Sequence, residues 1–379
     1  MTLYHLIFIV KIKIIMNVCI IGEGLTALSL AKSLINKKIN VHYYYKSRNS
    51  NFSSNRTIGI SKSNFEFFKE KIFQISKNNY WKINRIEIYT DKIDTENLLK
   101  FENDKNDLFY IIKNDELLKS LNNNLIKSKF FKKIILSKNI NEEFLNKKEY
   151  DLIINCDANN FLAKKYFTKK ISKNYYNLAY TTILKHKKIE NNTATQIFTK
   201  QGPIAFLPIS STETSVVYSM DIKNKKFDNS DVIDLINKNN PKYLINKIDK
   251  LNSFELSSSN LRNYYHKNIL AFGDMLHRVH PLAGQGFNMT IRDLRILTKI
   301  IEDKIELGMQ LDSQIFDEFE KKTKDKNFVF SKAIDLIYES FNLDKKVQNK
   351  SFSKILKRIG KNKNLNNYFI KLADAGINF

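Results

Sequence analysis

Two glycines near the start of the chain stand where a backbone could hold a phosphate. Residues 22–27 read GEGLTA and follow a short apolar run. Gly22 would permit a tight turn, Gly24 would let the backbone approach a pyrophosphate, and the small Ala27 would let a helix pack closely on a strand. The helix would also offer unpaired N–H groups to the phosphates. The segment predicts a dinucleotide site, with a turn that binds nothing as the alternative.

A second segment, residues 273–288, combines a carboxylate with turn-forming residues. Asp274 could accept hydrogen bonds from sugar-like hydroxyls, and Gly284 and Gly286 open a helical pattern. The N–H groups at that helix start could stabilise negative charge on a bound ring. The alternative is a helix-start turn without a ligand. Five of the ten glycines in the chain lie in these two segments, whereas roughly 27 would be usual for this length.

The histidines and cysteines do not form a metal-binding pattern. His277 and His280 could share one face of a helix, but neither a third ligand nor a carboxylate partner is evident. We therefore expect no metal, and for His277 a structural role or one close to the bound cofactor. The two cysteines, Cys19 and Cys156, lie in no zinc or disulfide pattern. No G-x-S-x-G turn supports hydrolysis.

The flanking patterns indicate the elements that hold both segments. Apolar runs at Asn17 to Ile21 and Ile39 to Tyr45 enclose a helical pattern that begins at Leu25, which is the strand–helix–strand order of a dinucleotide-binding unit. The acidic residue that usually binds the ribose is absent, and Tyr45 stands at its position. A strand at Ile269 to Phe272 precedes the second segment, and a long amphipathic helix follows it.

Alternating runs elsewhere favour an antiparallel sheet with one buried face. They cover residues 82–90, 181–185 and 215–220. We expect these strands to form a substrate domain that is inserted into the dinucleotide-binding domain.

The net positive charge is high, and the basic residues are spread along the whole chain. The 63 Lys and Arg exceed the 39 Asp and Glu by 24. Because lysine is mixed with abundant Asn, Ile, Phe and Tyr, AT-rich codon usage accounts for most of this excess, and no nucleic-acid motif accompanies it. A basic amphipathic run at 345–363 could bind an anionic membrane surface or pack on its own domain. We interpret residues 1–15 as an N-terminal extension, and a signal peptide is the less favoured interpretation.

The second segment resembles the aromatic-ring flavin monooxygenases of the p-hydroxybenzoate hydroxylase fold, whose motif reads GD-x-x-H, then P, then GQG-x-N. Residues 193–199 (TATQIFT) with 202–208 (GPIAFLP), residues 55–61 (NRTIGIS) and the ending 372–376 (LADAG) are similar to ubiquinone-biosynthesis hydroxylases that act on polyprenylated phenols.

The resemblance implies which residues contact FAD. Asp274 would bind the ribityl chain, Arg56 would contact FAD, and residues 281–288 would border the isoalloxazine ring. Asp157 stands in the family's third motif, where Ala158 replaces a glycine. Together with the first glycine turn, the assigned residues are Gly22, Gly24, Leu25, Thr26, Ala27, Arg56, Asp157, Gly273, Asp274, Pro281, Gly284, Gln285, Gly286, Phe287 and Asn288.

The chain also departs from the family at several positions. Met275 and Leu276 replace two alanines and could tighten the space beside the flavin, and Lys164 stands where the family usually has arginine. Together with Tyr45 and Ala158, these changes leave open an alternative, in which the chain is a diverged relative that binds little or no flavin.

The predicted fold class is α/β with an α+β insertion: a Rossmann-type FAD-binding domain, an antiparallel-sheet substrate domain and a C-terminal helical segment. The expected division is 16–80, 101–170 and 265–335 for the FAD-binding domain, 81–100 and 171–264 for the substrate domain, and 336–379 for the helical segment.

The resemblance implies a monooxygenase that uses NAD(P)H and O2, through a flavin C4a-hydroperoxide, to hydroxylate a polyprenylated phenol in ubiquinone biosynthesis. Only one Rossmann-type glycine turn is present, so NADPH or NADH would bind transiently. The alternatives are another flavin oxidoreductase, such as a prenyl reductase, and a non-catalytic scaffold member. We expect a cytoplasmic protein without nucleic-acid partners. Contact with the inner face of a membrane or with a quinone-synthesis complex is left open.

Overall fold

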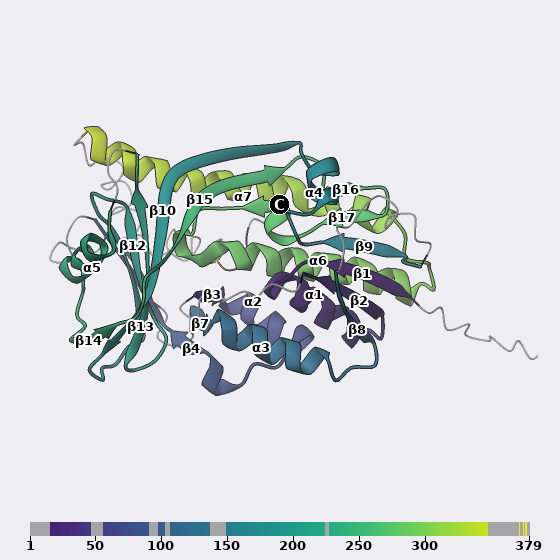
Figure 1. Ribbon diagram of the computed structural model, residues 1–379, viewed down its shortest axis with the longest axis horizontal. Coiled ribbons are helices and arrows are strands. Elements are labelled where there is room, and N and C mark those ends of the chain that lie inside the picture. The colour runs from purple at the N-terminus through teal and green to yellow at the C-terminus, as the bar shows by residue number, and fades with distance from the viewer. Residues whose placement is uncertain are drawn as a thin grey trace, which may run out of the picture.

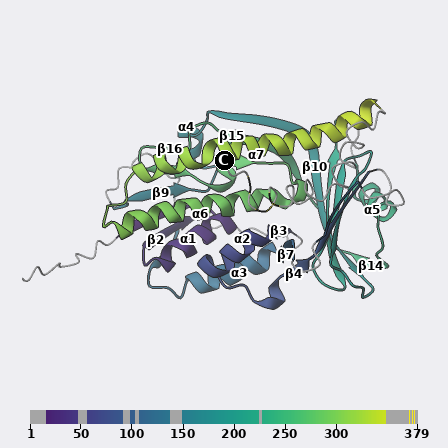
Figure 2. The same ribbon diagram turned by 180° about the vertical axis from the view of Figure 1, so that it is seen from behind.

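The computed structural model describes residues 16–46, 56–90, 98–102, 107–136, 149–223 and 227–347, together with 371, 374 and 376. A large sheet stands at the left of Figure 1, and a layer of helices and a second sheet extend from it to the right. Figure 2 shows the same arrangement from behind, with α6 and α7 lying along each other. The expected extension at 1–15 and most of the basic run at 345–363 lie outside the described residues.

A six-stranded sheet carries the first glycine turn. Its order is β16, β17, β9, β1, β2, β8, and all neighbours are parallel except β16 and β17. Both faces are covered, so the central strands are continuous apolar runs. The bounds are β1 Asn17–Ile21, β2 Asn40–Tyr45, β8 Phe131–Ile135, β9 Leu152–Asn155, β16 Tyr265–His266 and β17 Ile269–Ala271.

Helices α3, α1, α6 and α7 follow one another from bottom to top in Figure 1. Helix α1 packs against both α3 and α6, and α6 packs against α7. The apolar residues of α1 and α6 join the strands in one large core cluster. The helix bounds are α1 Leu25–Asn36, α2 Lys62–Phe67, α3 Asn114–Leu125, α4 Phe161–Tyr166, α5 Asn229–Lys238, α6 Gln285–Glu306 and α7 Gln314–Val347.

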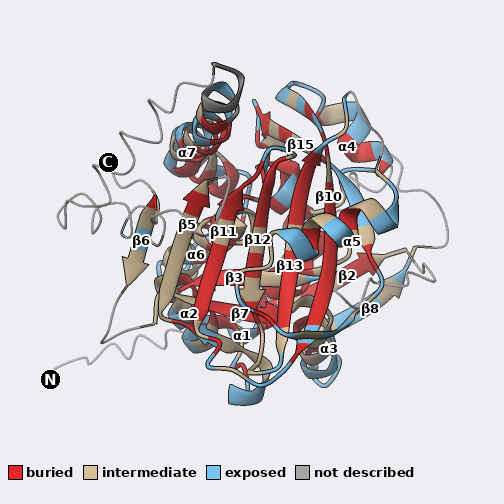
Figure 3. Ribbon diagram, turned by 90° about the vertical axis from the view of Figure 1, so that its left-hand side faces the viewer, coloured by how far each residue is buried: buried red, intermediate tan, exposed pale blue. Residues whose placement is uncertain are grey.

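A nine-stranded sheet forms the second layer. Its order is β18, β15, β10, β13, β12, β11, β5, β6, with β14 paired to β10, and every pair is antiparallel except β11 with β5. Helix α5 covers its outer face, which Figure 3 turns toward the viewer. The bounds are β5 Arg85–Thr90, β6 Leu99–Glu102, β10 Lys170–His186, β11 Thr193–Phe198, β12 Pro203–Pro208, β13 Glu213–Asp221, β14 Ile245–Ile248, β15 Asn252–Leu261 and β18 His277–Arg278.

The residues of this large sheet alternate between its two faces. Ile204 and Phe206 of β12 are buried in the cluster under α5, whereas Ala205 and Leu207 are half-buried on the opposite face. Because successive side chains of a strand point to opposite faces, one face forms the core with α5 and the other is left for a cavity.

A small third sheet joins the two layers. It consists of β3 Thr57–Ser61, β7 Phe109–Lys113 and β4 Trp81–Ile83, all antiparallel. The alternating run expected over 82–90 therefore divides at Asn84, and only its second half enters the large sheet. Short helical turns complete the described chain at Phe68–Ile72, Lys77–Asn79, Gly273–Met275 and Leu282–Gly284.

The predicted fold class is confirmed: a mixed α/β unit with parallel and antiparallel sheets and a helical segment after them. None of the helices in the described ranges combines the length and the apolar character that crossing a membrane would require.

Candidate functional site

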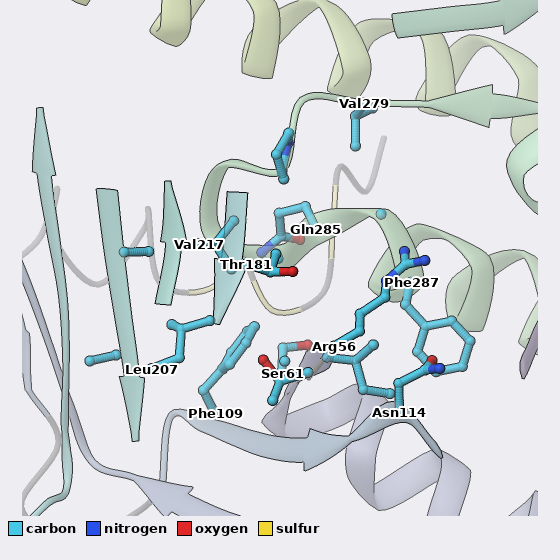
Figure 4. Close-up of a pocket in the computed structure, with 18 of the residues that line it drawn as sticks. Arg56, Ser61, Phe109, Asn114, Thr181, Leu207, Val217, Val279, Gln285 and Phe287 are labelled. Carbon is cyan, nitrogen blue, oxygen red and sulfur yellow. The ribbon is translucent and has the colours of Figure 1, made fainter. Parts of the chain in front are cut away.

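One large pocket lies between the layers, with a volume of about 950 Å³. The nine-stranded sheet and the small three-stranded sheet contribute to its lining, as do the N-terminal ends of α1 and α6. Figure 4 shows Leu207, Val217 and Thr181 on the strands of the large sheet, with Arg56 and Phe287 on the opposite side. The volume is at the upper end of the range for small-molecule sites.

The first glycine turn places the N-terminus of α1 at the pocket. Gly24 caps the helix with φ of 100°, a conformation that L side chains rarely adopt, and a Cβ added there would meet no atom within 4 Å. Glu23, Leu25 and Thr26 line the pocket beside it. The first turn of α1 carries no acidic residue. The open space at Gly24 therefore adjoins a helix N-terminus, where an anion could be bound.

The second segment brings the N-terminus of α6 to the same pocket. Pro281, Gly284, Gln285, Gly286 and Phe287 all line it. A Cβ added at Gly286 would also meet no atom within 4 Å. Since the first turn of this 22-residue helix contains no acidic residue, its positive end is available to a negatively charged group.

Asp274 extends an exposed carboxylate into the wall between these two helix starts. It sits in the short helical turn Gly273–Met275, directly after β17. Gly273 packs on α1, because a Cβ there would lie 2.5 Å from Cγ2 of Thr26. The two segments that the sequence singled out are thus in contact with each other.

Arg56 lies across the pocket at the start of β3. Its guanidinium carbon is 5.9 Å from the centre of the Phe254 ring on β15, and both residues line the pocket. This contact joins the small sheet to the large one at the mouth of the cavity.

Five of the assigned residues do not line the pocket, namely Gly22, Ala27, Asp157, Gly273 and Asn288. A Cβ at Gly22 would lie 3.0 Å from the carbonyl carbon of Cys156, so this glycine permits close approach to β9. Asp157 follows β9, where its carboxylate accepts a hydrogen bond from the Asn159 backbone at 2.8 Å. These positions shape the turns that carry the lining residues.

Asn288 is a buried connector between β3 and α6. Its Nδ2 donates to the carbonyl oxygens of Gly59 at 2.9 Å and Gly284 at 3.1 Å, and its Oδ1 accepts from the Ser61 backbone at 2.9 Å. All three neighbours line the pocket. Asn288 therefore fixes the distance between two walls.

Three expectations for the second segment were wrong. Met275 and Leu276 are buried in the main core and do not narrow the pocket. His277 has a carboxylate partner, because its Nε2 lies 2.5 Å from Oδ2 of Asp293 on α6. His277 and His280 occur on a strand and the loop after it, not on a helix.

The ring of His280 lies away from the pocket. It stacks on Tyr338 at 4.2 Å and meets Tyr175 edge-on at 5.0 Å, and burial lowers its pKa to about 3. Nothing in the described ranges gathers three or more His, Cys, Asp or Glu side chains in a geometry that could hold a metal ion.

Tyr45, which stands at the position expected for a ribose-binding acid, does not line the pocket. Its ring lies 5.9 Å from that of Tyr43, and the ammonium of Lys133 lies 4.5 Å from its centre. The carboxylate of Glu23 is instead the acidic group beside the first glycine turn. Sequence reasoning missed Glu23 because it occupies a variable position between the two glycines.

The end of the pocket nearest the large sheet is largely apolar. Thr181 on β10 and Gln196 on β11 are polar exceptions there. Gln196 was visible only as part of the TATQIFT motif, and nothing in the motif indicated which face it would occupy. The apolar lining comprises Ile86, Ile88, Phe101, Ala194, Ala205, Leu207, Val217 and Leu256.

The residues present fit a flavin dinucleotide. Open backbone at Gly24 and Gly286 leaves space at two helix N-termini, and an exposed carboxylate stands between them. A pyrophosphate, a ribityl chain and an electron-rich ring require these three kinds of contact.

Comparison with known proteins agrees with this geometry. The profile of the FAD binding domain family matches residues 176–320. The chain is 25% identical over 197 residues to the mitochondrial ubiquinone biosynthesis monooxygenase COQ6 of Caenorhabditis elegans, an alignment that covers 41% of this chain and 44% of that protein. It is 25% identical over 333 residues to the Drosophila melanogaster COQ6, covering 72% and 69%.

The alignments span about a third to a half of the length of several of these relatives. The structural similarity covers more of the chain than most of these sequence alignments do. The crystal structure of p-nitrophenol 4-monooxygenase PnpA from Pseudomonas putida DLL-E4 superimposes with a TM-score of 0.75 at 12% identity, covering 96% of this chain and 99% of that one. These matches show that the chain carries an FAD binding domain, is similar in sequence to ubiquinone biosynthesis monooxygenases, and shares the fold of p-nitrophenol 4-monooxygenase PnpA.

Proposed function

We propose that this protein hydroxylates the aromatic ring of a polyprenylated phenol in ubiquinone biosynthesis, with FAD as cofactor, NAD(P)H as reductant and O2 as co-substrate. The observation that carries the proposal is a single pocket in which two helix N-termini and a free carboxylate lead into an apolar chamber. The relatives named for ubiquinone biosynthesis support the substrate class.

In this proposal the first glycine turn holds the pyrophosphate. The N–H groups at the start of α1 bind its oxygens, and Gly24 removes the side chain that would block them. Asp274 accepts hydrogen bonds from the ribityl hydroxyls, and Arg56 closes the pocket over the cofactor from the opposite wall. These groups bind and orient the cofactor.

The start of α6 sets the electrostatics at the ring. The positive N-terminal end of this helix, at Gly284 to Gly286, stabilises negative charge that develops when the flavin is reduced. Bound FAD would accept a hydride from NAD(P)H and activate O2 for transfer of one oxygen atom to the phenol. The protein positions the reactants and supplies the electrostatic field for this step.

The apolar chamber orients the phenol and excludes water. Side chains of β5, β11, β12 and β13 form one wall, and a lipid-tailed ring buries apolar surface against them at roughly 25 cal/mol per Å². Exclusion of water protects the activated oxygen from side reactions. Peripheral contact with a membrane or a quinone-synthesis complex would bring such a substrate to the pocket and belongs to the proposal.

A second candidate is a flavin oxidoreductase that transfers no oxygen, such as a prenyl reductase. The same pocket would serve it, because an apolar chamber beside a flavin suits either reaction. The experiment is to titrate purified protein with FAD and then follow NADPH oxidation with and without a prenylated phenol. Stoichiometric FAD with phenol-stimulated oxidation and a hydroxylated product supports the hydroxylase. FAD binding with oxidation but no oxygenated product favours the reductase, and no FAD binding contradicts both.

A further inference from the structure

The described residues near the C-terminal end of the chain contribute to the main pocket. Asp374 lines it together with Ser61 and Lys62, which are more than 300 positions away in the sequence. Sequence reasoning had noted the 372–376 segment only as part of a family resemblance and had assigned it no role. Its contacts indicate one.

Asp374 is hydrogen-bonded to the turn between β3 and α2. Its carboxylate Oδ1 accepts a hydrogen bond from the backbone N–H of Ser63 at 2.8 Å, in the first turn of α2. Its carbonyl oxygen accepts from Oγ of Ser61 at 3.2 Å and from Oγ of Ser63 at 3.4 Å. A carboxylate that accepts a backbone N–H at the start of a helix satisfies a group that otherwise has no intrahelical partner.

The same turn is connected to the loop that opens α6. Ser61 N and Asn64 Nδ2 donate to Oδ1 of Asn288, at 2.9 Å and 3.2 Å. Asn288 in turn donates to the Gly284 carbonyl at 3.1 Å. A continuous hydrogen-bond chain therefore leads from Asp374, through the β3–α2 turn, to the backbone of Gly284.

The carboxylate of Asp374 also interacts electrostatically with two arginines of α6. Burial lowers the pKa values of Arg292 and Arg295 on α6, and the negative charge of Asp374 opposes this lowering at both. Nη2 of Arg295 also donates to the Ser63 carbonyl at 2.9 Å. The carboxylate thus lies between the start of α2 and two partly desolvated cations, where loss of its charge would be felt by both.

Gly376 packs closely on α6. Its φ is 78°, and a Cβ added there would lie 2.3 Å from Nη1 of Arg292. A side chain would be strained by the backbone conformation and would displace the guanidinium. Gly376 therefore lies against α6 in a position that suits glycine alone.

We propose that Asp374 is a positioning residue for the flavin pocket: it holds the Ser61–Asn64 turn against the Gly284–Asn288 loop and so sets the width of the cavity where the isoalloxazine ring would lie. This inference rests on the proposed FAD site. Asp374 acts through Ser63 and Asn288 and is not assigned a catalytic step.

The experiment measures FAD affinity by titrating apo-protein and following the quenching of flavin fluorescence, with far-UV circular dichroism and the unfolding midpoint as controls for folding. Asp374→Ala is expected to raise the FAD Kd about tenfold, the size of one lost charge-assisted contact. Asp374→Asn keeps an oxygen that can accept from Ser63 but loses the charge, so it is expected to recover only part of this loss. Gly376→Ala should weaken FAD binding in the same direction, whereas Lys371→Ala, an exposed change on the same segment, should leave Kd unchanged.

The outcomes separate this inference from the proposed function. Wild-type protein that binds no FAD contradicts the proposed function itself. Wild-type binding with equal affinity in Asp374→Ala and Gly376→Ala overturns the positioning role. A lowered unfolding midpoint in these variants with unchanged Kd also overturns it, because the segment would then contribute only stability. If Asp374→Ala fails to fold, Gly376→Ala and Asp374→Asn decide by the same measurement.

Discussion

Nε2 of His277 lies 2.5 Å from Oδ2 of Asp293, and both side chains are 1% exposed. Oδ1 of the same carboxylate accepts a hydrogen bond from Nδ2 of Asn327 at 2.9 Å. Asp293 therefore ties three segments together: the β18 strand that follows the Asp274 turn, helix α6 and helix α7. The stretch that carries the pocket residues Arg278, Val279 and Pro281 starts from this anchor.

We predict that Asp293→Ala destabilises the fold by about 3 kcal/mol, because removal of the carboxylate leaves the buried Nε2 of His277 and Nδ2 of Asn327 without their hydrogen-bond partner. Denaturant-induced unfolding measures this loss. The matched control is Asp303→Ala on the same helix, where the carboxylate pairs with Lys299 on the surface and loss should stay below about 1 kcal/mol. Equal, small losses in both variants would contradict the structural role of the His277–Asp293 contact.

Asp274→Ala should abolish FAD retention during purification. The carboxylate is exposed in the pocket wall, so its loss removes hydrogen bonds to a ligand and leaves the protein core unchanged. The absorbance of bound flavin per protein is the measurement. Asp234→Ala, on the exposed side of α5, is the control and should keep wild-type flavin content. Wild-type flavin content in Asp274→Ala would contradict the assignment of this site to FAD.

Much of this arrangement was predictable from local patterns. The glycine turn after β1, the strand before Gly273 and the helix after it are each specified by residues close in sequence, and their contact through Gly273 and Thr26 follows from the fold class. The partner of His277 was not predictable, because it lies 16 positions away on a face of α6 that only tertiary packing defines. The same holds for Asp374 and Ser63, which are 311 positions apart.

The small three-stranded sheet shows the same limit of local patterns. The run over 82–90 alternates as one strand would, yet it divides between two sheets because Trp81–Ile83 pairs with β7 and Arg85–Thr90 pairs with β11. Period-two alternation indicates a strand with two different faces but does not identify its partner.

Stability should fall with acid through His280. Burial lowers its pKa from 6.5 to about 3, so between these values the unfolded chain binds a proton that the folded protein excludes. The stabilising effect is complete above the unfolded pKa and is lost as pH falls below it, by about 1.4 kcal/mol per pH unit. His280→Leu removes this contribution.

The measurement for His280 is the free energy of unfolding of both proteins at about pH 7 and about pH 5. The difference between wild type and His280→Leu should shift by about 2 kcal/mol in favour of the variant at the lower pH. An identical difference at both pH values would mean that the ring is accessible to protons in the folded state.

Gln196→Leu should raise KM for a phenolic substrate about tenfold and leave FAD affinity unchanged. The amide lines the pocket on β11, two residues after Ala194, where it can donate to or accept from a ring oxygen. A pocket with few polar groups uses them to orient its ligand. Gln201→Leu, outside the pocket lining, is the control. Unchanged KM in Gln196→Leu would place the phenol elsewhere in the chamber.

The central claim is oxygen transfer to an aromatic ring, and the most direct measurement is isotope incorporation. Purified, FAD-loaded protein is supplied with NADPH, a prenylated phenol and O2 enriched in the heavy oxygen isotope, and the product is analysed by mass spectrometry. The account predicts one heavy oxygen atom in the hydroxylated ring. NADPH oxidation with an unlabelled or unmodified phenol would contradict it.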